Sequence, residues 1–234
     1  LDFDLSADLT GTTGAGLEVI GLTDQGVLDI DLNAGGDVAG TTGILLAGGP
    51  EVDLDFASAV TATGGHAISV QGRTGGEAVS IVGTAASSVD ATGGNGIFVG
   101  DQGDSPTNSS FGDITIDMAG TVDSTQTGIA VSQAGAGDID IDLSGALTAG
   151  GNGIDVLTIG AGAATITTTG TIDSAGSGLD IASMGAGNVL LDIDADVTNT
   201  GTDSVVQAAS LGAGDVRVEL DAAVSGPVAT IVRP

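Results

Sequence analysis

The sequence contains no cysteine, no lysine, no tryptophan and no tyrosine. Without cysteine the chain has no disulfide framework, no thiolate nucleophile and no zinc ribbon. Phenylalanine, present four times, is the only large aromatic residue. Sugar-binding grooves usually offer aromatic faces to their ligand, so four phenylalanines make a poor platform. These absences exclude thiol chemistry and disfavour a carbohydrate-binding cleft.

Basic residues are even scarcer than aromatic ones. Arg73, Arg217 and Arg233 stand against 31 acidic residues, and the net charge is −28. Nucleic acids and anionic membranes are bound through Lys and Arg, which neutralise phosphates. We therefore expect no nucleic-acid partner and no direct membrane insertion by this segment.

Glycine is abundant: 42 of the 234 residues, against about 7% in an average protein. High glycine content together with high charge is common in disordered chains, but such chains are poor in apolar residues. This chain is 41% hydrophobic. It therefore has the material for a packed core.

A repeat of about 25 residues runs through the whole chain. Its clearest copy starts with IDIDLSG at residues 139–145, continues with GIDV at 153–156 and closes with a Gly-Ala-Gly turn. Successive copies are 24 to 35 residues apart, and steps of 25 and 27 each occur three times. The first residue of the unit recurs as Leu1, Leu28, Val52, Val79, Ile114, Ile139, Ala164, Val189 and Val216. A second anchor recurs as Leu17, Ile44, Ile68, Ile97, Ile129, Ile154, Leu179 and Val205.

Within each unit apolar residues alternate with polar ones, as Ile139, Ile141 and Leu143 alternate with Asp140 and Asp142. A period of two predicts a half-buried strand and not a helix. Two further short strands are expected in each unit, one around Leu147 and one around Ile154. Strands that recur once per repeat, in register, form parallel sheets, and parallel crossovers are strongly right-handed. The sequence thus predicts an all-β protein, a right-handed parallel β-helix (β-solenoid) of about nine coils, as a single domain over residues 1–234.

The two ends of the sequence carry apolar strand patterns without a polar cap. Residues 1–5 read LDFDL and residues 231–234 read IVRP. Solenoids normally need polar terminal caps, and an open parallel edge invites strand addition. We expect either a fragment of a longer solenoid or a subunit that associates with itself end to end.

The unit Ile-x-Ile-Asp-Leu-x-Gly, followed by Gly-x-Gly-Ile-x-Val and Gly-Ala-Gly-Asp, resembles the degenerate β-strand repeats of bacterial surface proteins. The passenger regions of Gram-negative autotransporters and related large adhesins are the nearest match. The resemblance covers essentially all of the chain. It implies secretion, display outside the outer membrane, and a role in adhesion, aggregation or surface coating.

One outward position of the repeat is acidic in seven of nine coils, and only Val82 and Thr167 interrupt it. We name this set the acidic column: Asp4, Asp31, Asp55, Asp117, Asp142, Asp192 and Glu219. Carboxylates stacked one coil apart repel by roughly 0.8 kcal/mol per pair in water. Calcium, with oxygen ligands at about 2.3–2.6 Å, is suited to bridge such pairs. The alternative is a solvated acidic face whose charge is screened by salt, and it is favoured because exposed carboxylates usually need no dedicated ion.

Enzymatic activity is the least favoured reading. Polysaccharide-cleaving β-helices resemble this chain in architecture only, because their motifs with clustered Asp, Gly-His-Gly and a basic residue are missing. The single histidine, His66, is expected to be a solvent-facing turn residue, and Arg73 is expected to pair with Glu77 in a surface salt bridge. A regular exposed column treats its carboxylates alike, whereas hydrolysis needs two pKa values pushed apart.

The fourth coil carries an insertion at residues 100–110, with the sequence GDQGDSPTNSS. Insertions in repeat arrays are often binding loops, and Asp101 and Asp104 are its candidate contacts for a cation or partner. A tolerated surface insertion explains it equally well. Taken together, the sequence predicts a non-enzymatic extracellular stalk or filament subunit, with a ligand-binding adhesin as the alternative.

Overall fold

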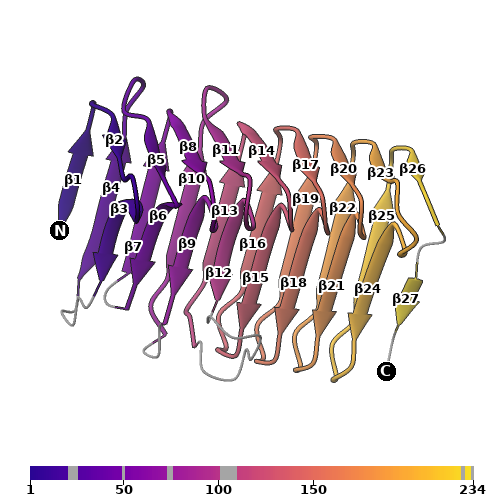
Figure 1. Cartoon of the computed structure of the whole chain (residues 1–234). Coiled ribbons are helices and arrows are strands. Elements are labelled where there is room, and N and C mark those ends of the chain that lie inside the picture. Colours follow the sequence, from indigo (N-terminus) through magenta and orange to yellow (C-terminus); the bar gives the residue numbers. More distant parts are fainter. Residues whose placement is uncertain (21–25, 49–50, 73–75, 101–109, 228–229, 233–234) are drawn as a thin grey trace.

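The computed structural model describes residues 1–20, 26–48, 51–72, 76–100, 110–227 and 230–232. These residues form 27 β-strands and no helix. The strands build three parallel sheets of nine strands each, and the chain visits the three sheets in turn (Figure 1). The protein is a right-handed parallel β-helix with three strands per coil, as the repeat predicted.

Each sheet collects one strand from every coil. Sheet A holds β1 (Asp2–Leu5), β4 (Val27–Leu32), β7 (Glu51–Phe56), β10 (Val79–Gly83), β13 (Ile114–Met118), β16 (Ile139–Leu143), β19 (Ala164–Thr168), β22 (Val189–Ile193) and β25 (Val216–Leu220). Sheet B holds β2 (Leu9–Thr10), β5 (Val38–Gly40), β8 (Ala59–Ala62), β11 (Ser88–Ala91), β14 (Thr121–Ser124), β17 (Leu147–Ala149), β20 (Ile172–Ser174), β23 (Val197–Asn199) and β26 (Val224–Ser225). Sheet C holds β3 (Ala15–Ile20), β6 (Thr42–Ala47), β9 (Ile68–Gln71), β12 (Ile97–Gly100), β15 (Ile129–Gln133), β18 (Ile154–Thr158), β21 (Leu179–Ser183), β24 (Val206–Ser210) and β27 (Thr230–Val232).

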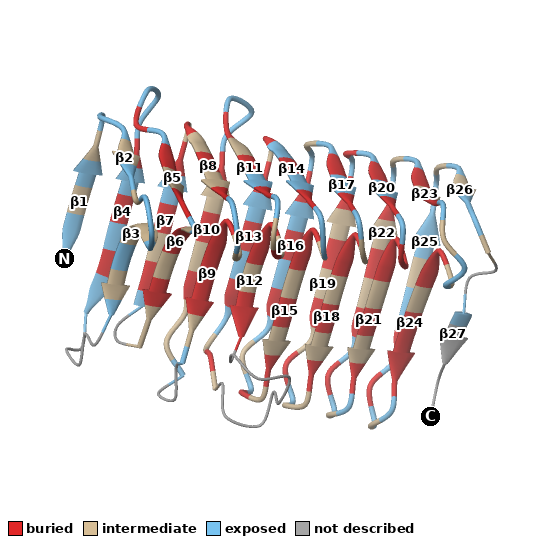
Figure 2. Cartoon of the chain, viewed as in Figure 1, coloured by how far each residue is buried: buried red, intermediate tan, exposed pale blue. Residues whose placement is uncertain are grey.

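The alternation in the sequence decides which side chains enter the core. In β16, Ile139, Ile141 and Leu143 are at most 1% exposed, whereas Asp140 and Asp142 between them are exposed. Burial alternates in the same way along most strands of sheet A (Figure 2). Full burial of one such apolar side chain contributes about 1.5–3 kcal/mol.

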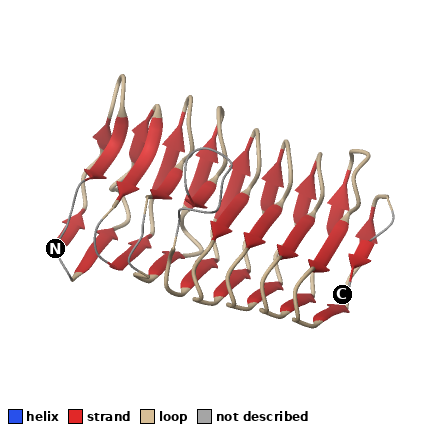
Figure 3. Ribbon diagram, turned by 90° about the horizontal axis from the view of Figure 1, so that it is seen from below, coloured by secondary structure: helices blue, strands red, loops and turns tan. Residues whose placement is uncertain are grey.

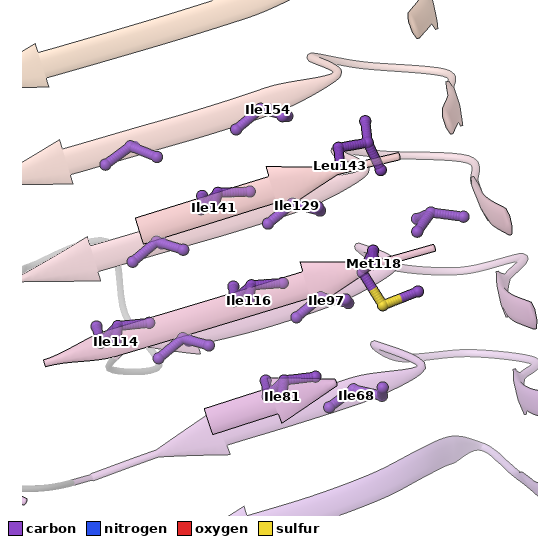
Figure 4. Close-up of a cluster of buried hydrophobic side chains, with 14 of the residues drawn as sticks. Ile68, Ile81, Ile97, Ile114, Ile116, Met118, Ile129, Ile141, Leu143 and Ile154 are labelled. Carbon is purple, nitrogen blue, oxygen red and sulfur yellow. The ribbon is translucent and has the colours of Figure 1, made fainter. Parts of the chain in front are cut away.

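Inward residues stack on the equivalent residues of neighbouring coils and form one continuous core. Ile116 pairs with Ile81 on one side and with Ile141 on the other. Figure 4 shows these side chains in rows that follow the coils, with Met118 beside Leu143 at the end of their strands. Since each coil buries its apolar face only against its neighbours, the stability of the rod is shared along its length.

The end coils are less well covered than the middle ones. Phe3, Leu5 and Leu9 in the first coil, like Val218 and Val224 in the last, are only partly buried. Leu1 is 62% exposed and Leu220 is 46% exposed. The first strand, β1, and the last strand, β27, lie at opposite ends of the row of coils (Figures 1 and 3).

One anchor assigned from the sequence is wrong by a single residue. Leu179 pairs with Val206, not with Val205. Ser174 at the end of β20 pairs with Asn199 at the end of β23, so the two turns that follow start at equivalent positions. The turn between β23 and β24 has two more residues than the turn between β20 and β21. Val205 takes the place of Gly178, and its carbonyl accepts a hydrogen bond from the Leu179 amide. Both valines are buried and apolar, so the pattern alone did not separate them.

Candidate functional site: the acidic face of sheet A

The acidic column runs along the outer face of sheet A. Parallel pairing places Asp4 beside Asp31, Asp31 beside Asp55, Asp117 beside Asp142, and Asp192 beside Glu219. Val82 and Thr167 hold the two positions that lack a carboxylate. The column is therefore three short acidic runs, not one continuous chain of charges.

A second outward column lies two residues away on the same face. It starts with Asp2, Asp29 and Asp53 in the first three coils, has Asp140 in the sixth and ends with Arg217 in the ninth. In coils 1 to 3 these two columns therefore hold six carboxylates, whereas in the last coil one of them holds a cation.

The crowding of carboxylates affects their protonation. The pKa of Asp29 is raised by partial desolvation and by the charges of Asp31, Asp2 and Asp53, in that order. The pKa values of Asp55 and Asp142 are raised in the same way, by desolvation first and then by neighbouring aspartates. Desolvation is the largest cause of these raised pKa values, and repulsion between neighbouring carboxylates adds to it.

Protein groups compensate the charge at both ends of the acidic column. Asn33 Nδ2 donates a hydrogen bond to Asp4 Oδ1 at 2.5 Å. Arg217 forms an ion pair with Glu219. Between these ends a shallow depression of about 150 Å³ is lined by Asp31, Leu32, Asn33, Asp55, Phe56, Ala57 and Thr84.

The fit of this face to calcium is incomplete in geometry. Calcium takes six to eight oxygen ligands, and an adjacent pair in the column supplies two carboxylates. Within the described residues no group of three or more His, Asp or Glu side chains is arranged to hold a metal ion. The assignment of the acidic column as calcium ligands stays a prediction, and water would have to complete the coordination.

A different set of acidic residues is structural, and sequence reasoning missed it. At the corner before sheet A, Asp113 Oδ1 accepts a hydrogen bond from the Asp138 amide at 2.9 Å, and Asp138 Oδ1 accepts from the Ala163 amide at 2.8 Å. Asn188 repeats this contact with the Asp215 amide at 2.8 Å. Each side chain thus binds the backbone of the next coil.

The other two corners use the same device. Before sheet B, the carboxylates of Asp8, Asp37 and Asp196 accept amide hydrogen bonds from the following coil. Before sheet C, Asn95 and Asn152 do so through their side-chain oxygens. The available signal was an Asp or Asn one or two residues before a strand in several of the repeats.

Two more carboxylates missed from the sequence lie on the outer face of sheet C. Asp155 pairs with Asp180 of the next coil. Asn152 Nδ2 donates to Asp155 Oδ2 at 2.9 Å, which lowers the pKa of Asp155, but desolvation outweighs this contact and the pKa is raised. The pKa of Asp180 is also raised, by desolvation and then by Asp155 and Asp203.

His66 is not the solvent-facing turn residue that the sequence predicted. Its ring stacks on Phe98 with a centroid separation of 4.7 Å and an interplanar angle of 12°. Its Nδ1 accepts a hydrogen bond from the Asn95 amide at 3.1 Å. Partial burial lowers the pKa of His66. The aromatic partner one coil away was not visible as a neighbour in the sequence, and His66 serves as a corner acceptor like Asn95.

The remaining predicted residues lie where the structure gives no description. Asp101 and Asp104 of the insertion and Arg73 of the predicted Arg73–Glu77 pair fall outside the described residues. Their roles stay predictions.

A cavity of about 290 Å³ lies near the last coils. Its lining residues are Ala163, Thr165, Asn188, Val189, Leu190, Asp215 and Arg217. It combines apolar side chains with a guanidinium, unlike the acidic first coils.

Comparisons with family models, with curated proteins and with solved structures find no match to this chain. Over the described ranges, none of the secondary structure is helical, so no helix there has the length and apolarity to cross a membrane.

Proposed function

We propose that the chain is a non-enzymatic structural and adhesive element of a bacterial cell surface, a stiff acidic stalk or filament subunit outside the cell. The observation that supports this is the shared register of three nine-stranded sheets. Nine coils about 4.8 Å apart give a rod of roughly 40 Å. Because every coil is hydrogen bonded to the next on three sides, bending the rod requires distortion of all three sheets.

The resemblance of the repeats to autotransporter passenger regions supports the extracellular location. The charge supports it as well, since a net charge of −28 keeps a protein soluble and opposes nonspecific association. On the acidic face this charge is hydrated and screened by the ions of the medium.

The same register supports the proposal that the chain associates with itself end to end. Apolar side chains of the first and last coils, such as Phe3 and Val218, are only partly buried, and a second copy stacked on either end would cover them. A copy added beyond β25 in the existing register places its Phe3 over Val218 and its Leu5 over Leu220. It also places its Asp2 beside Arg217, a pair of opposite charges, and its Asp4 beside Glu219, a pair of like charges.

Sedimentation velocity over a range of concentrations tests this association. The expected result at about 0.15 M salt is a mass that rises with concentration, and an Arg217→Glu variant that associates less. Arg73→Glu, with the same change of net charge, is the control. A mass that stays monomeric at every concentration would refute end-to-end stacking.

A ligand-binding adhesin is the second candidate, favoured by the cavity beside Arg217. Electron microscopy of the native assembly separates the two candidates. Continuous stacks of the repeat support the filament subunit. Isolated rods that bind host cells, with binding that Arg217→Ala abolishes, support the adhesin.

Calcium bridging of the acidic column is a specific addition to the proposal. It is supported by the four stacked acidic pairs and by the neighbouring aspartates, which add to desolvation in raising the pKa values of Asp55 and Asp142. If calcium bridges the pairs, EDTA lowers the melting temperature at low salt, and Asp142→Asn reduces that effect. An unchanged melting temperature leaves the hydrated face as the account of the column.

A further inference from the structure

A column of polar side chains lies inside the solenoid, at the end of sheet C. Gln133 pairs with Thr158, Thr158 with Ser183, and Ser183 with Ser210 in consecutive coils. All four are at most 1% exposed. Buried polar atoms usually have hydrogen-bond partners, so each of these residues needs one.

Each of the four residues opens the same arch, a Gly-Ala-Gly segment that leads back to sheet A. The arches span residues 133–137, 158–162, 183–187 and 210–214. They stack closely: a Cβ added to Gly160 would lie 1.5 Å from Gly135 O, and one added to Gly185 would lie 1.5 Å from Gly160 O. Arches in such close contact share one backbone path, so the same region inside each arch is bounded by equivalent carbonyl groups.

Gln133 reaches these carbonyls directly. Its Nε2 donates to Gly137 O in its own arch at 3.0 Å, and to Phe111 O and Gly112 O in the preceding coil, each at 3.2 Å. Glycine stacking identifies Gly112 as the equivalent of Gly137. One amide group therefore connects two successive arches.

The shorter side chains that follow do not reproduce this connection. Ser183 Oγ reaches one equivalent carbonyl, Gly187 O, at 3.1 Å. Thr158 Oγ1, Ser210 Oγ and also Gln133 Oε1 are buried without a protein hydrogen-bond partner among the described residues. A buried hydroxyl or amide oxygen without a partner costs about 1–3 kcal/mol.

We propose that the arches at 158–162, 183–187 and 210–214 each bind one internal water molecule at the place where the amide of Gln133 lies in the first arch. The water of the 158–162 arch accepts from the Thr158 hydroxyl and donates to Gly162 O and to Gln133 Oε1, because Gly137 O already accepts from Gln133 Nε2. The water beside Ser183, whose hydroxyl donates to Gly187 O, donates to Ser183 Oγ and to Gly162 O. The water beside Ser210 accepts from that hydroxyl and donates to Gly214 O and to Gly187 O. Buried waters typically make about three such bonds, and this file of waters holds the C-terminal coils together along the rod axis.

A pair of threonine variants tests the file by the sign of the stability change. Thr158→Val removes the hydroxyl that holds a water, so the melting temperature is expected to fall. Thr168→Val is the matched control, because Thr168 Oγ1 is also buried without a partner but its sheet neighbours are Leu143 and Ile193. That control is expected to hold or raise the melting temperature. The proposal would be overturned if both variants had melting temperatures equal to or higher than that of the wild-type chain.

A crystal structure of the wild-type chain, at a resolution where single waters are seen, gives an independent readout. The expected result is one density peak in each of the three arches, within hydrogen-bond distance of the hydroxyl and the glycine carbonyl. Thr158→Gln is expected to lose the peak of its own arch while keeping the wild-type melting temperature. Arches without peaks in the wild-type crystal would refute the file, whatever the variants do.

Discussion

Replacement of a single glycine in a stacked arch is expected to separate two coils. A Cβ added to Gly160 lies 1.5 Å from Gly135 O, and observed Cβ contacts stay above 3.0 Å. In Gly160→Ala the two arches must therefore move apart by at least 1.5 Å, a large fraction of the roughly 4.8 Å between coils. The neighbour to be displaced is backbone, so no side-chain rotation relieves the contact.

The size of the effect follows from the bonds beside the arch. The Ile159 amide donates to Gln133 O at 2.9 Å, and the Met184 amide donates to Thr158 O at 2.8 Å. Losing these two coil-to-coil bonds costs about 1 kcal/mol each, and the overpacking adds about 1–3 kcal/mol. A total of about 3–5 kcal/mol lowers the melting temperature of a chain of this size by roughly 10 °C.

Thermal unfolding followed by far-ultraviolet circular dichroism measures this change. Gly14→Ala is the control, because a Cβ at Gly14 meets nothing within 4 Å and its φ is not left-handed. It is expected to change stability by less than about 1 kcal/mol. Equal melting temperatures for Gly160→Ala and Gly14→Ala would show that the arches do not stack as described.

Two further predictions concern the carboxylates. The free energy of unfolding should rise as the pH falls from 7 toward 4. The pKa values of these carboxylates are raised in the folded state, so the folded state binds more protons than the unfolded state. The gain in stability is complete below pH 3.8 and is lost as the pH rises through the folded-state pKa values. The responsible groups are Asp29, Asp55, Asp142, Asp155 and Asp180. His66 opposes them, since its lowered pKa costs stability below 6.5; a urea midpoint that drops steadily from pH 6 to pH 4 would contradict the prediction. Asp138→Ala should destabilise by about 1 kcal/mol because the Ala163 amide loses its acceptor, whereas Asp138→Asn keeps an oxygen there and should cost less; equal urea midpoints for the two variants would argue against the corner contact.

Much of the fold was predictable because its main signal is local. The alternation of Ile139, Ile141 and Leu143 with aspartates requires a strand with one buried face, and its recurrence requires the strands to stack. The register within sheets A and B could be predicted from the same columns of apolar residues. The register of Val206 did not, since a turn can absorb two extra residues without any change in the apolar pattern.

The acidic residues were harder to assign because their type and their spacing are alike in every role. Asp138 and Asp142 recur with the same period, yet one binds the backbone of the next coil and the other faces solvent. The two side chains differ in the direction in which they point, because Asp138 lies at a corner and Asp142 lies in a strand. The number and spacing of the charges do not reveal this direction. The contact between His66 and Phe98 was missed for a similar reason. These residues are 32 positions apart, and their stacking can be predicted only when the length of that coil is known.

Cysteine cross-linking tests the stacking of the coils most directly, because the sequence has no cysteine of its own. Asp117 and Asp142 are parallel Cα partners, about one coil spacing apart, which is within disulfide reach. Thr115 and Asp142 lie two residues out of register, at roughly 8 Å, which is beyond it. The account predicts that Asp117→Cys with Asp142→Cys closes an intramolecular disulfide under mild oxidation and that Thr115→Cys with Asp142→Cys does not; equal yields for the two pairs, or closure of the second alone, would contradict it.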